Sequence, residues 1–388
     1  MGLMYHYARF PDDRELVAAV AAAGSRLHDK LAALAAERLD ISDYNKHYLR
    51  RYQEKLHSNL QKFAYILSWA LAGADKPLAD TVLLDYGGGA GILSMLARES
   101  GVGTVIYNDI YDVSCVDAET VGVLTGTAAD YYVCGDVRTM TRLLESQSLS
   151  CDVMVSSDVI EHIYDMGAFF RNIRDLSHGH LSIAMSSHAN PRNPVVRRLL
   201  TRKQVQVERE DRAYAHGHKK RDNLRSYLRI REDIARECGG GVLSETETAA
   251  LARRTRGMID ADIRASVARY IETGELPPPI DHPTNTCDPY TGNWADRLLD
   301  PREIGHGFAR AGFRVDILSG FYGRPNGLVK RVLARLLDLA IAVTNGKSLR
   351  LAPFFLIHGS GDMSLYKPRR AAAGAPAAAR EVEPAGVA

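Results

Sequence analysis

The stretch Val82-Leu83-Leu84-Asp85-Tyr86-Gly87-Gly88-Gly89-Ala90-Gly91 places three apolar residues and an acid before a turn with four glycines in five positions. The next residues, 92–100, have the composition of a helix. Together they predict a strand, a tight turn and a helix start. Because glycine has no Cβ, such a turn lets the backbone come within contact distance of a ligand. The N–H groups at the helix start then point into the same gap.

Two kinds of ligand compete for such a turn. A dinucleotide fingerprint needs Gly-x-Gly-x-x-Gly, and its third glycine falls on Ile92 or on Ser94, depending on where the count starts. A nicotinamide oxidoreductase is therefore disfavoured. The pattern present is Asp-x-Gly-x-Gly-x-Gly, formed by Asp85, Gly87, Gly89 and Gly91, with Gly88 inside the turn. It resembles motif I of the class I S-adenosylmethionine-dependent methyltransferases.

The segments that follow agree with this resemblance in their order and spacing. Further strands are expected at residues 102–107, 131–134, 151–157 and 181–185. Asp109 comes directly after the first of these, 20 residues beyond Gly89. A carboxylate at this strand end can accept hydrogen bonds from both ribose hydroxyls of a nucleoside. The strand at 151–157 runs into residues 158–162, Asp-Val-Ile-Glu-His, which look like a recurrent element of the same family.

The resemblance implies S-adenosylmethionine as the cofactor. In the family, the acid after the second strand faces the ribose and an acid after the third faces the adenine. The implied cofactor-binding residues are Asp85, Gly87, Gly88, Gly89, Gly91, Asp109, Ile110, Asp136, Val137 and Asp158. Any one of these acids is also compatible with a structural role as a turn or strand-end cap.

Two histidines are the candidates for catalysis. Methyl transfer is an in-line displacement, so the acceptor atom must be held close to the methyl group. A hydroxyl acceptor also needs a base whose pKa is near neutral. His188 and His162 directly follow the fifth and fourth expected strands, although a structural role is open for both. His216, His218 and His282 are weaker candidates from the segment that follows.

A metal is considered and not predicted. Asp158, Glu161 and His162 resemble the Glu-x-x-Glu-His element of small-RNA 2′-O-methyltransferases, which hold magnesium with a further histidine. Here aspartate replaces the first glutamate. The Asp-x-x-Glu-His form also occurs in metal-free small-molecule methyltransferases. The sequence therefore predicts no metal ligands.

Length, net charge and cysteine content limit the class of protein that this sequence can encode. At 388 residues the chain exceeds one ordinary domain, and its formal net charge of +2 excludes no class of partner. Five scattered cysteines without paired spacing predict free thiols rather than zinc ligands or disulfides. The N-terminus lacks a signal-peptide pattern, and no uncharged apolar run reaches membrane-spanning length. We therefore expect a cytoplasmic protein.

The expected architecture is α/β: a Rossmann-like, seven-stranded methyltransferase sheet with an N-terminal helical extension and a helical insertion after strand five. Its parts are the extension (1–77), the cofactor-binding core (78–190), the insertion (191–300), the completion of the sheet (301–366) and a disordered tail (367–388).

Three segments outside the core carry predictions of their own. One helix is expected from Asp43 to Leu71, and its tyrosines with Arg50 and Arg51 either pack on the core or close over the cofactor. Ser244 and Glu247 predict a capping box that opens a helix to about Tyr270. The apolar residues 328–343 favour a core or dimer-packing helix over an interfacial membrane helix.

The insertion bears on the acceptor. Between Arg192 and Arg236 the sequence has 14 Lys/Arg and 6 Asp/Glu, which is either a solvated helix face or a surface for an anionic acceptor. Only Tyr214 and Tyr227 are interleaved, whereas RNA-binding surfaces usually carry more aromatic residues for stacking. The loop 285–294 suits a substrate rim or a loop packed on its own aromatics.

The favoured function is an S-adenosylmethionine-dependent methyltransferase with a small-molecule or glycan-like, anionic acceptor, and O-methylation is preferred. Nucleic acid is disfavoured as a partner, and a homodimer is considered. The alternatives are a magnesium-dependent RNA 2′-O-methyltransferase and a non-catalytic scaffold with the methyltransferase fold.

Overall fold

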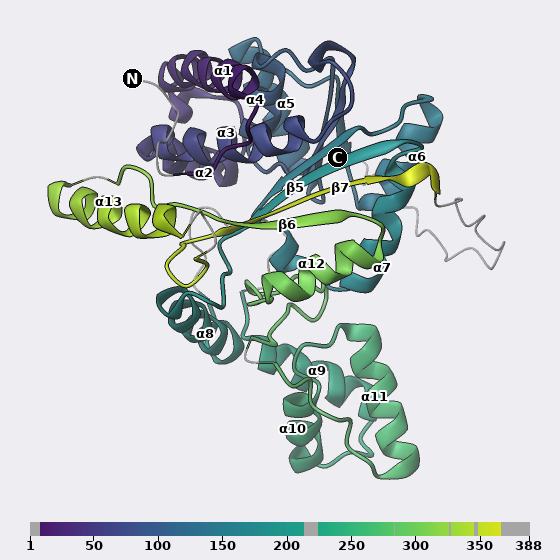
Figure 1. The fold of residues 1–388 in the computed structure, drawn as a ribbon. Helices are drawn as coiled ribbons and strands as arrows, with labels where there is room; N and C mark the ends of the chain where they lie inside the picture. The colour runs from purple at the N-terminus through teal and green to yellow at the C-terminus, as the bar shows by residue number, and fades with distance from the viewer. Residues whose placement is uncertain (1–7, 213–223, 283, 326, 345–347, 366–388) are drawn as a thin grey trace.

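The computed structural model describes residues 8–212, 224–282, 284–325, 327–344 and 348–365 (Figure 1). Seven strands form one sheet in the order β3-β2-β1-β4-β5-β7-β6. All pairs are parallel except those of β7, which runs antiparallel to β5 and β6. The predicted α/β fold is confirmed. The strands are β1 Val82–Tyr86, β2 Thr104–Asp109, β3 Tyr131–Cys134, β4 Val153–Ser157, β5 His180–Ser187, β6 Arg314–Ser319 and β7 Phe355–Asp362.

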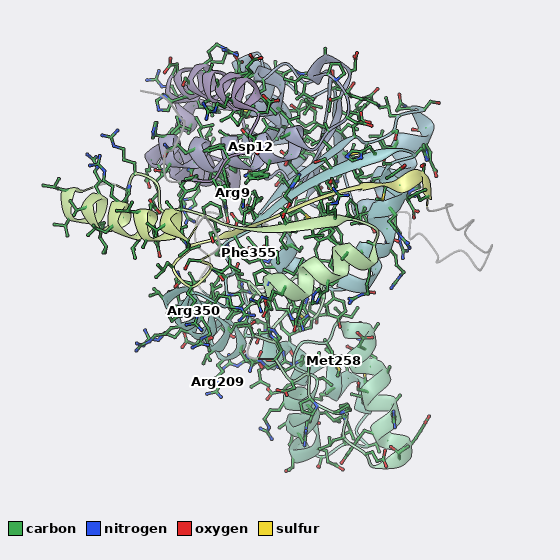
Figure 2. All side chains as sticks on the ribbon, viewed as in Figure 1. Arg9, Asp12, Arg209, Met258, Arg350 and Phe355 are labelled. Atoms are coloured by element: carbon green, nitrogen blue, oxygen red, sulfur yellow. The ribbon has the colours of Figure 1, made fainter. Side chains whose placement is uncertain are left out.

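Helices cover both faces of the sheet, which is why β1, β4 and β5 are almost continuously buried. One face carries α1 Arg14–Ala32, α3 Leu56–Ala72, α4 Ile92–Glu99 and α5 Asp112–Thr125. The other carries α6 Val137–Ser146, α7 Met166–Asn172 and α12 Pro301–Arg310. Each layer has its own apolar core. Phe355 of β7, labelled in Figure 2, belongs to the second core.

The strand order reverses between β1 and β4. From β1 the chain moves outward to β2 and β3, and it then returns to place β4 on the other side of β1. In open α/β sheets, ligands bind beyond the carboxyl ends of the strands at such a switch point. The loops after β1, β2, β4 and β5 all leave the sheet at this edge.

The N-terminal extension contains a break that the sequence analysis did not predict. α2 spans Asp43–Glu54 and α3 begins at Leu56, so the single helix expected from Asp43 to Leu71 is wrong at Lys55, which has φ −127° and ψ 27°. Because of this break, α3 packs against the sheet while α2 contacts α5. At the start of α2, Asn45 Nδ2 donates to Asp117 Oδ2 of α5 over 2.7 Å.

The insertion forms a small helical unit below the sheet in Figure 1. It comprises α8 Pro194–Arg209, α9 Tyr227–Gly239, α10 Glu245–Arg254 and α11 Asp260–Thr273. The most buried apolar side chains of its core are Ile230, Ile234, Ala235, Leu251, Ile263 and Val267. The capping box of Ser244 and Glu247 is present. The helix it opens ends at Arg254, not near Tyr270. In the following turn Gly257 has φ +86° and packs so closely that a Cβ there would lie 2.7 Å from Asn285 O.

The apolar segment 328–343 forms α13, Leu328–Val343, which projects from the rest of the chain in Figure 1. Only Ala334, Asp338 and Ile341 are buried, so α13 is not a core helix. In the parts of the chain that the structure describes, no helix combines the length and apolarity needed to cross a membrane. Some predictions fall outside the described residues: the tail, 367–388, and the candidates Tyr214, His216 and His218.

Candidate active site

The glycine turn after β1 leaves room for a ligand at one position and is packed tightly at another. Gly87 has φ +73°, and a Cβ there would lie 2.4 Å from Val159 Cγ2, in the segment after β4. Gly89 has φ +54°, and a Cβ there would meet no described atom within 4 Å. Gly91 N-caps α4 in the left-handed conformation. The turn therefore needs glycine for its own packing and presents open backbone at Gly89.

Asp85 supports this turn from within the protein. It is 1% exposed, and its Oδ2 accepts hydrogen bonds from Ser94 N over 3.0 Å and from Ser94 Oγ over 2.7 Å. Burial raises the pKa of Asp85 to about 7, even though the Ser94 hydrogen bonds act in the opposite direction. Its contacts join the end of β1 to the first turn of α4. The structure thus gives Asp85 a supporting position behind the expected cofactor cradle.

Asp109 lies at the end of β2 and reaches the glycine turn. Its Oδ2 accepts from Gly89 N over 3.0 Å, and its Oδ1 accepts from Tyr111 N over 3.0 Å. Tyr107, two residues earlier, donates its hydroxyl to Gly89 O over 2.6 Å. The carboxylate is thus in contact with the open glycine, and we call the open space at Gly89 the crevice. These residues fit the ribose side of a nucleoside, where a carboxylate meets two hydroxyls.

The expected adenine side is also at this edge. Asp136 N-caps α6 and is exposed, and Ile110 is 58% exposed. Val137, by contrast, is buried in the core. Burial raises the pKa of Tyr86 to about 12, and the negative charges of Asp136 and Asp109 add a smaller shift in the same direction. Both carboxylates are therefore near enough to the Tyr86 hydroxyl to oppose its ionisation.

A second group of polar side chains gathers beyond β4 and β5. Asp158 follows β4 with φ +59°, an unusual conformation for a residue with a side chain. Its Oδ1 accepts from His188 N over 2.9 Å and lies 3.2 Å from His188 Nδ1. Its Oδ2 accepts from Lys62 Nζ of α3 over 2.6 Å. Glu161 Oε1 lies 3.2 Å from the same Nδ1.

The insertion completes this group. Asp296 also has a positive φ, +55°, and its Oδ1 lies 3.7 Å from His188 Nε2 and 3.6 Å from His162 Nε2. Its Oδ2 is paired with Lys203 of α8. His162 Nδ1 lies 2.7 Å from the main-chain oxygen of Trp294. We refer to Asp158, Glu161, His162, His188 and Asp296, with Lys62 and Lys203, as the acceptor cluster.

The charges in the acceptor cluster are strongly coupled. Burial alone would lower the pKa of His188, but the carboxylates of Asp158 and Glu161 outweigh it and raise that pKa to about 10. Burial opposes ionisation of Asp158 and of Asp296, yet neighbouring cations hold the pKa of each carboxyl below its usual range. Lys62 and His188 act on Asp158, and Lys203 and His162 act on Asp296. His188 is therefore an imidazolium at neutral pH.

Glu161 is the least satisfied member of the cluster. It is 1% exposed, and neither carboxylate oxygen accepts a hydrogen bond within the described part of the chain. The single proton on His188 Nδ1 is already shared with Asp158. Asp158, Glu161 and His188 offer ligand atoms that all lie within 4.8 Å of one another. Two carboxylates and one imidazole could also hold a divalent cation, provided that His188 gives up its proton.

The sequence analysis missed three members of the cluster. Lys62, Lys203 and Asp296 approach from helices or loops far along the chain, and nothing in their local sequence marks them. One signal was available for Asp296, because it directly follows the loop 285–294 that was considered as a substrate rim. In that loop Trp294 is buried and stacks on Tyr164 with centroids 5.7 Å apart. His282, a weaker candidate, instead accepts from Thr284 N.

The comparisons with known proteins agree with this geometry. Residues 44–231 match the family model described as a methyltransferase domain. The chain is a class I S-adenosylmethionine-dependent methyltransferase. The bound cofactor supplies a methyl group already activated on a sulfonium. No curated protein matches the sequence of this methyltransferase.

Solved structures similar to this methyltransferase share little sequence with it. An S-adenosylmethionine-dependent methyltransferase from Mesorhizobium loti is 14% identical, over 74% of this chain and 93% of that one, with a TM-score of 0.32. One from Archaeoglobus fulgidus is 13% identical, over 81% and 99%, with a TM-score of 0.34. The geranyl diphosphate C-methyltransferase from Streptomyces coelicolor A3(2) is 11% identical, over 93% and 89%, also with 0.34. Such distant likenesses carry no argument about the acceptor.

Proposed function

We propose that this methyltransferase transfers a methyl group to a hydroxyl of a small or glycan-like, anionic acceptor held in the acceptor cluster. The observation that carries the proposal is the meeting of His162, His188 and Asp296 beyond the ends of β4 and β5. The crevice of Gly89 and Asp109 would hold the cofactor at the neighbouring strand ends. An acceptor between the two groups would lie within reach of the methyl group.

The two histidines take different roles in this proposal. The main-chain oxygen of Trp294 only accepts, so His162 Nδ1 carries the proton whenever the ring is neutral, and the lone pair is then on Nε2. His162 Nε2 is therefore the base that removes the hydroxyl proton. His188, as a charged donor, would attract an anionic group of the acceptor. Asp296 lies between both Nε2 atoms and orients the hydroxyl.

Release of S-adenosylhomocysteine tests this proposal with a panel of phosphorylated sugars, nucleotide-linked sugars, their amine analogues and RNA. A sugar hydroxyl is expected to support turnover, and His162→Asn should lower it by about 10²–10⁴-fold. His178→Asn is the matched control, because His178 is exposed before β5, at the opposite end of the strand from His188. Turnover with amines only, or an unaffected His162→Asn variant, would contradict the proposed base.

A second candidate, magnesium-dependent transfer, is favoured by the arrangement of Asp158, Glu161 and His188. In that case a hard cation would hold the acceptor oxygens in place of the charged histidine. Treatment with a chelator distinguishes the two candidates. Turnover that survives chelation supports the metal-free reaction, whereas loss of turnover that magnesium restores supports the second candidate. Restoration with RNA alone would indicate an RNA 2′-O-methyltransferase.

We also propose a reducing compartment, the cytoplasm, for this enzyme. All five cysteines are free, and Cys151 and Cys287 are fully buried. This agrees with compartments in which thiols stay reduced.

A further inference from the structure

α13 exposes an apolar face that neither the sheet nor the proposed reaction explains. Its exposed apolar side chains are Leu328, Val329, Val332, Leu333, Leu336, Leu339 and Val343. Val329 is 81% exposed, Val343 79% and Leu336 61%. Single exposed apolar residues are common on proteins, but a run of seven on one helix marks an interaction surface.

The seven residues form one continuous face. With 3.6 residues per turn, they fall within an arc of roughly 140° around the helix axis. The buried residues Ala334, Asp338 and Ile341 lie on the opposite side. Asp338 accepts a hydrogen bond from Tyr322 N over 2.8 Å, which fastens the inner side of the helix to the chain before it. The apolar arc is therefore directed away from the protein and held there.

The exposed charges on α13 are all basic. Lys330 and Arg335 are exposed, and Arg331 is half-buried, with its Nε donating to Pro325 O over 3.1 Å. Asp338, the acid of the helix, is buried. An apolar arc with basic residues beside it is the pattern of a helix that lies in the interface of an anionic membrane.

The start of α8 is linked to α13 through Tyr322 and also combines exposed apolar and basic residues. Asn193, its N-cap, lies 3.4 Å from the hydroxyl of Tyr322, whose main-chain N–H binds Asp338. Val195 is 74% exposed and Leu199 64%. Arg197, Arg198 and Arg202 of α8 are exposed as well. Figure 2 shows Arg350, another exposed basic residue, on the side of the molecule from which α13 projects.

A second copy of the chain fits this face less well. The two helices of a coiled coil meet along a narrow apolar stripe, the seam. Opposite charges beside this seam usually form ion pairs between the helices. The arc of α13 is wider than such a seam. Its exposed charges are of one sign, so two copies would bring basic residues together. Acidic lipid headgroups complement those charges.

We propose that α13 docks this methyltransferase onto an anionic lipid surface, with its apolar arc in the interface and Lys330 and Arg335 among the headgroups. The helix is too short and too charged to span the bilayer, so the attachment is peripheral and reversible. The proposal does not depend on the chemistry of the acceptor.

Flotation of the full-length protein with vesicles tests this docking. Binding is expected to vesicles of phosphatidylcholine with phosphatidylglycerol, to be much weaker with phosphatidylcholine alone, and to fall as salt rises. The double variant Val332→Glu/Leu336→Glu should lower the vesicle-bound fraction at least about tenfold. Lys330→Glu/Arg335→Glu should weaken binding only to the anionic vesicles.

The matched control is Val123→Glu/Leu124→Glu, which adds the same charges at exposed positions of α5 (64% and 55% exposed). It should float like the wild type. Calorimetric binding of S-adenosylhomocysteine verifies that each variant is folded. Three results would overturn the proposal: no flotation of the wild type, an unchanged α13 variant, or a lipid-free dimer in sedimentation that the α13 substitutions dissolve.

Discussion

The crevice at the end of β1 and the insertion after β5 contribute to the active site in different ways. At the crevice, the residues expected to face the cofactor lie within a few positions of strand ends, and many of the expected contacts are with backbone groups. At the acceptor cluster, Asp296 and Lys203 come from a separate helical unit. The difference teaches that the donor side follows from the fold itself, whereas the acceptor side is set by what is inserted into it.

The largest expected effect is a loss of stability in the insertion that the sheet does not share. Arg231 of α9 is fully buried, is paired with Glu208 and donates its Nε to Ala252 O over 2.8 Å. Arg231→Met would leave the buried Glu208 charge with only the more distant Arg256, 3.8 Å away, at a cost of up to about 3–5 kcal/mol in the free energy of unfolding. Urea unfolding followed by the fluorescence of Trp294 in a Trp69→Phe background should report this loss.

The controls for that substitution lie on the same helices. Arg229→Met removes an exposed pair with Asp211 and should cost at most about 1 kcal/mol. Arg231→Met/Glu208→Leu removes both charges and should recover much of the loss. If, in a Trp294→Phe background, Arg231→Met shifts the unfolding midpoint reported by Trp69 as much as it shifts the one reported by Trp294, the insertion is not an independent unit.

Asp296→Asn sharpens the comparison at the active site. The substitution keeps the shape of the side chain but removes the charge that faces both histidines and Lys203. Turnover with a saturating acceptor should fall about 100-fold, because the hydroxyl is no longer oriented. Calorimetric affinity for S-adenosylhomocysteine should stay unchanged. An equal loss of cofactor affinity would show that the two sides of the site are not separable.

Asp109→Ala is the reciprocal change on the donor side. It removes the carboxylate that lies beside Gly89 and faces the expected ribose position. The dissociation constant for S-adenosylmethionine should rise at least about tenfold, or about 1.4 kcal/mol. The matched variant Asp112→Ala, one turn along the same loop and helix start, should leave the affinity within about twofold. Unchanged calorimetric affinity in Asp109→Ala would remove that assignment.

The smallest expected effect is the pH dependence of the folding stability. Because the folded pKa of His188, about 10, lies above its ordinary value, the protonated ring stabilises the folded state fully below about pH 6.5. That contribution is lost as pH rises through 10. Glu161→Gln removes one of the two carboxylates and should lower the pKa seen by NMR for the His188 ring. A ring that titrates near pH 6.5 in the wild type would contradict the charged histidine.

Local patterns predicted most of the fold and the donor side. Apolar runs followed by turns located the first five strands, and the spacing from Gly89 to Asp109 located the carboxylate at the end of β2. Local patterns did not reveal the breaks at Lys55 and Gly257, because tertiary packing decides where those helices end. Lys62, Lys203 and Asp296 were out of reach for the same reason, since only the folded chain brings them to Asp158 and His188.

A crystal structure with S-adenosylhomocysteine tests the central claim most directly. The account predicts density for the nucleoside in the crevice after β1, with its backbone contact at Gly89 and its ribose hydroxyls on Asp109. Density at another place, or a crevice filled by the protein's own side chains while the ligand is bound elsewhere, would contradict it.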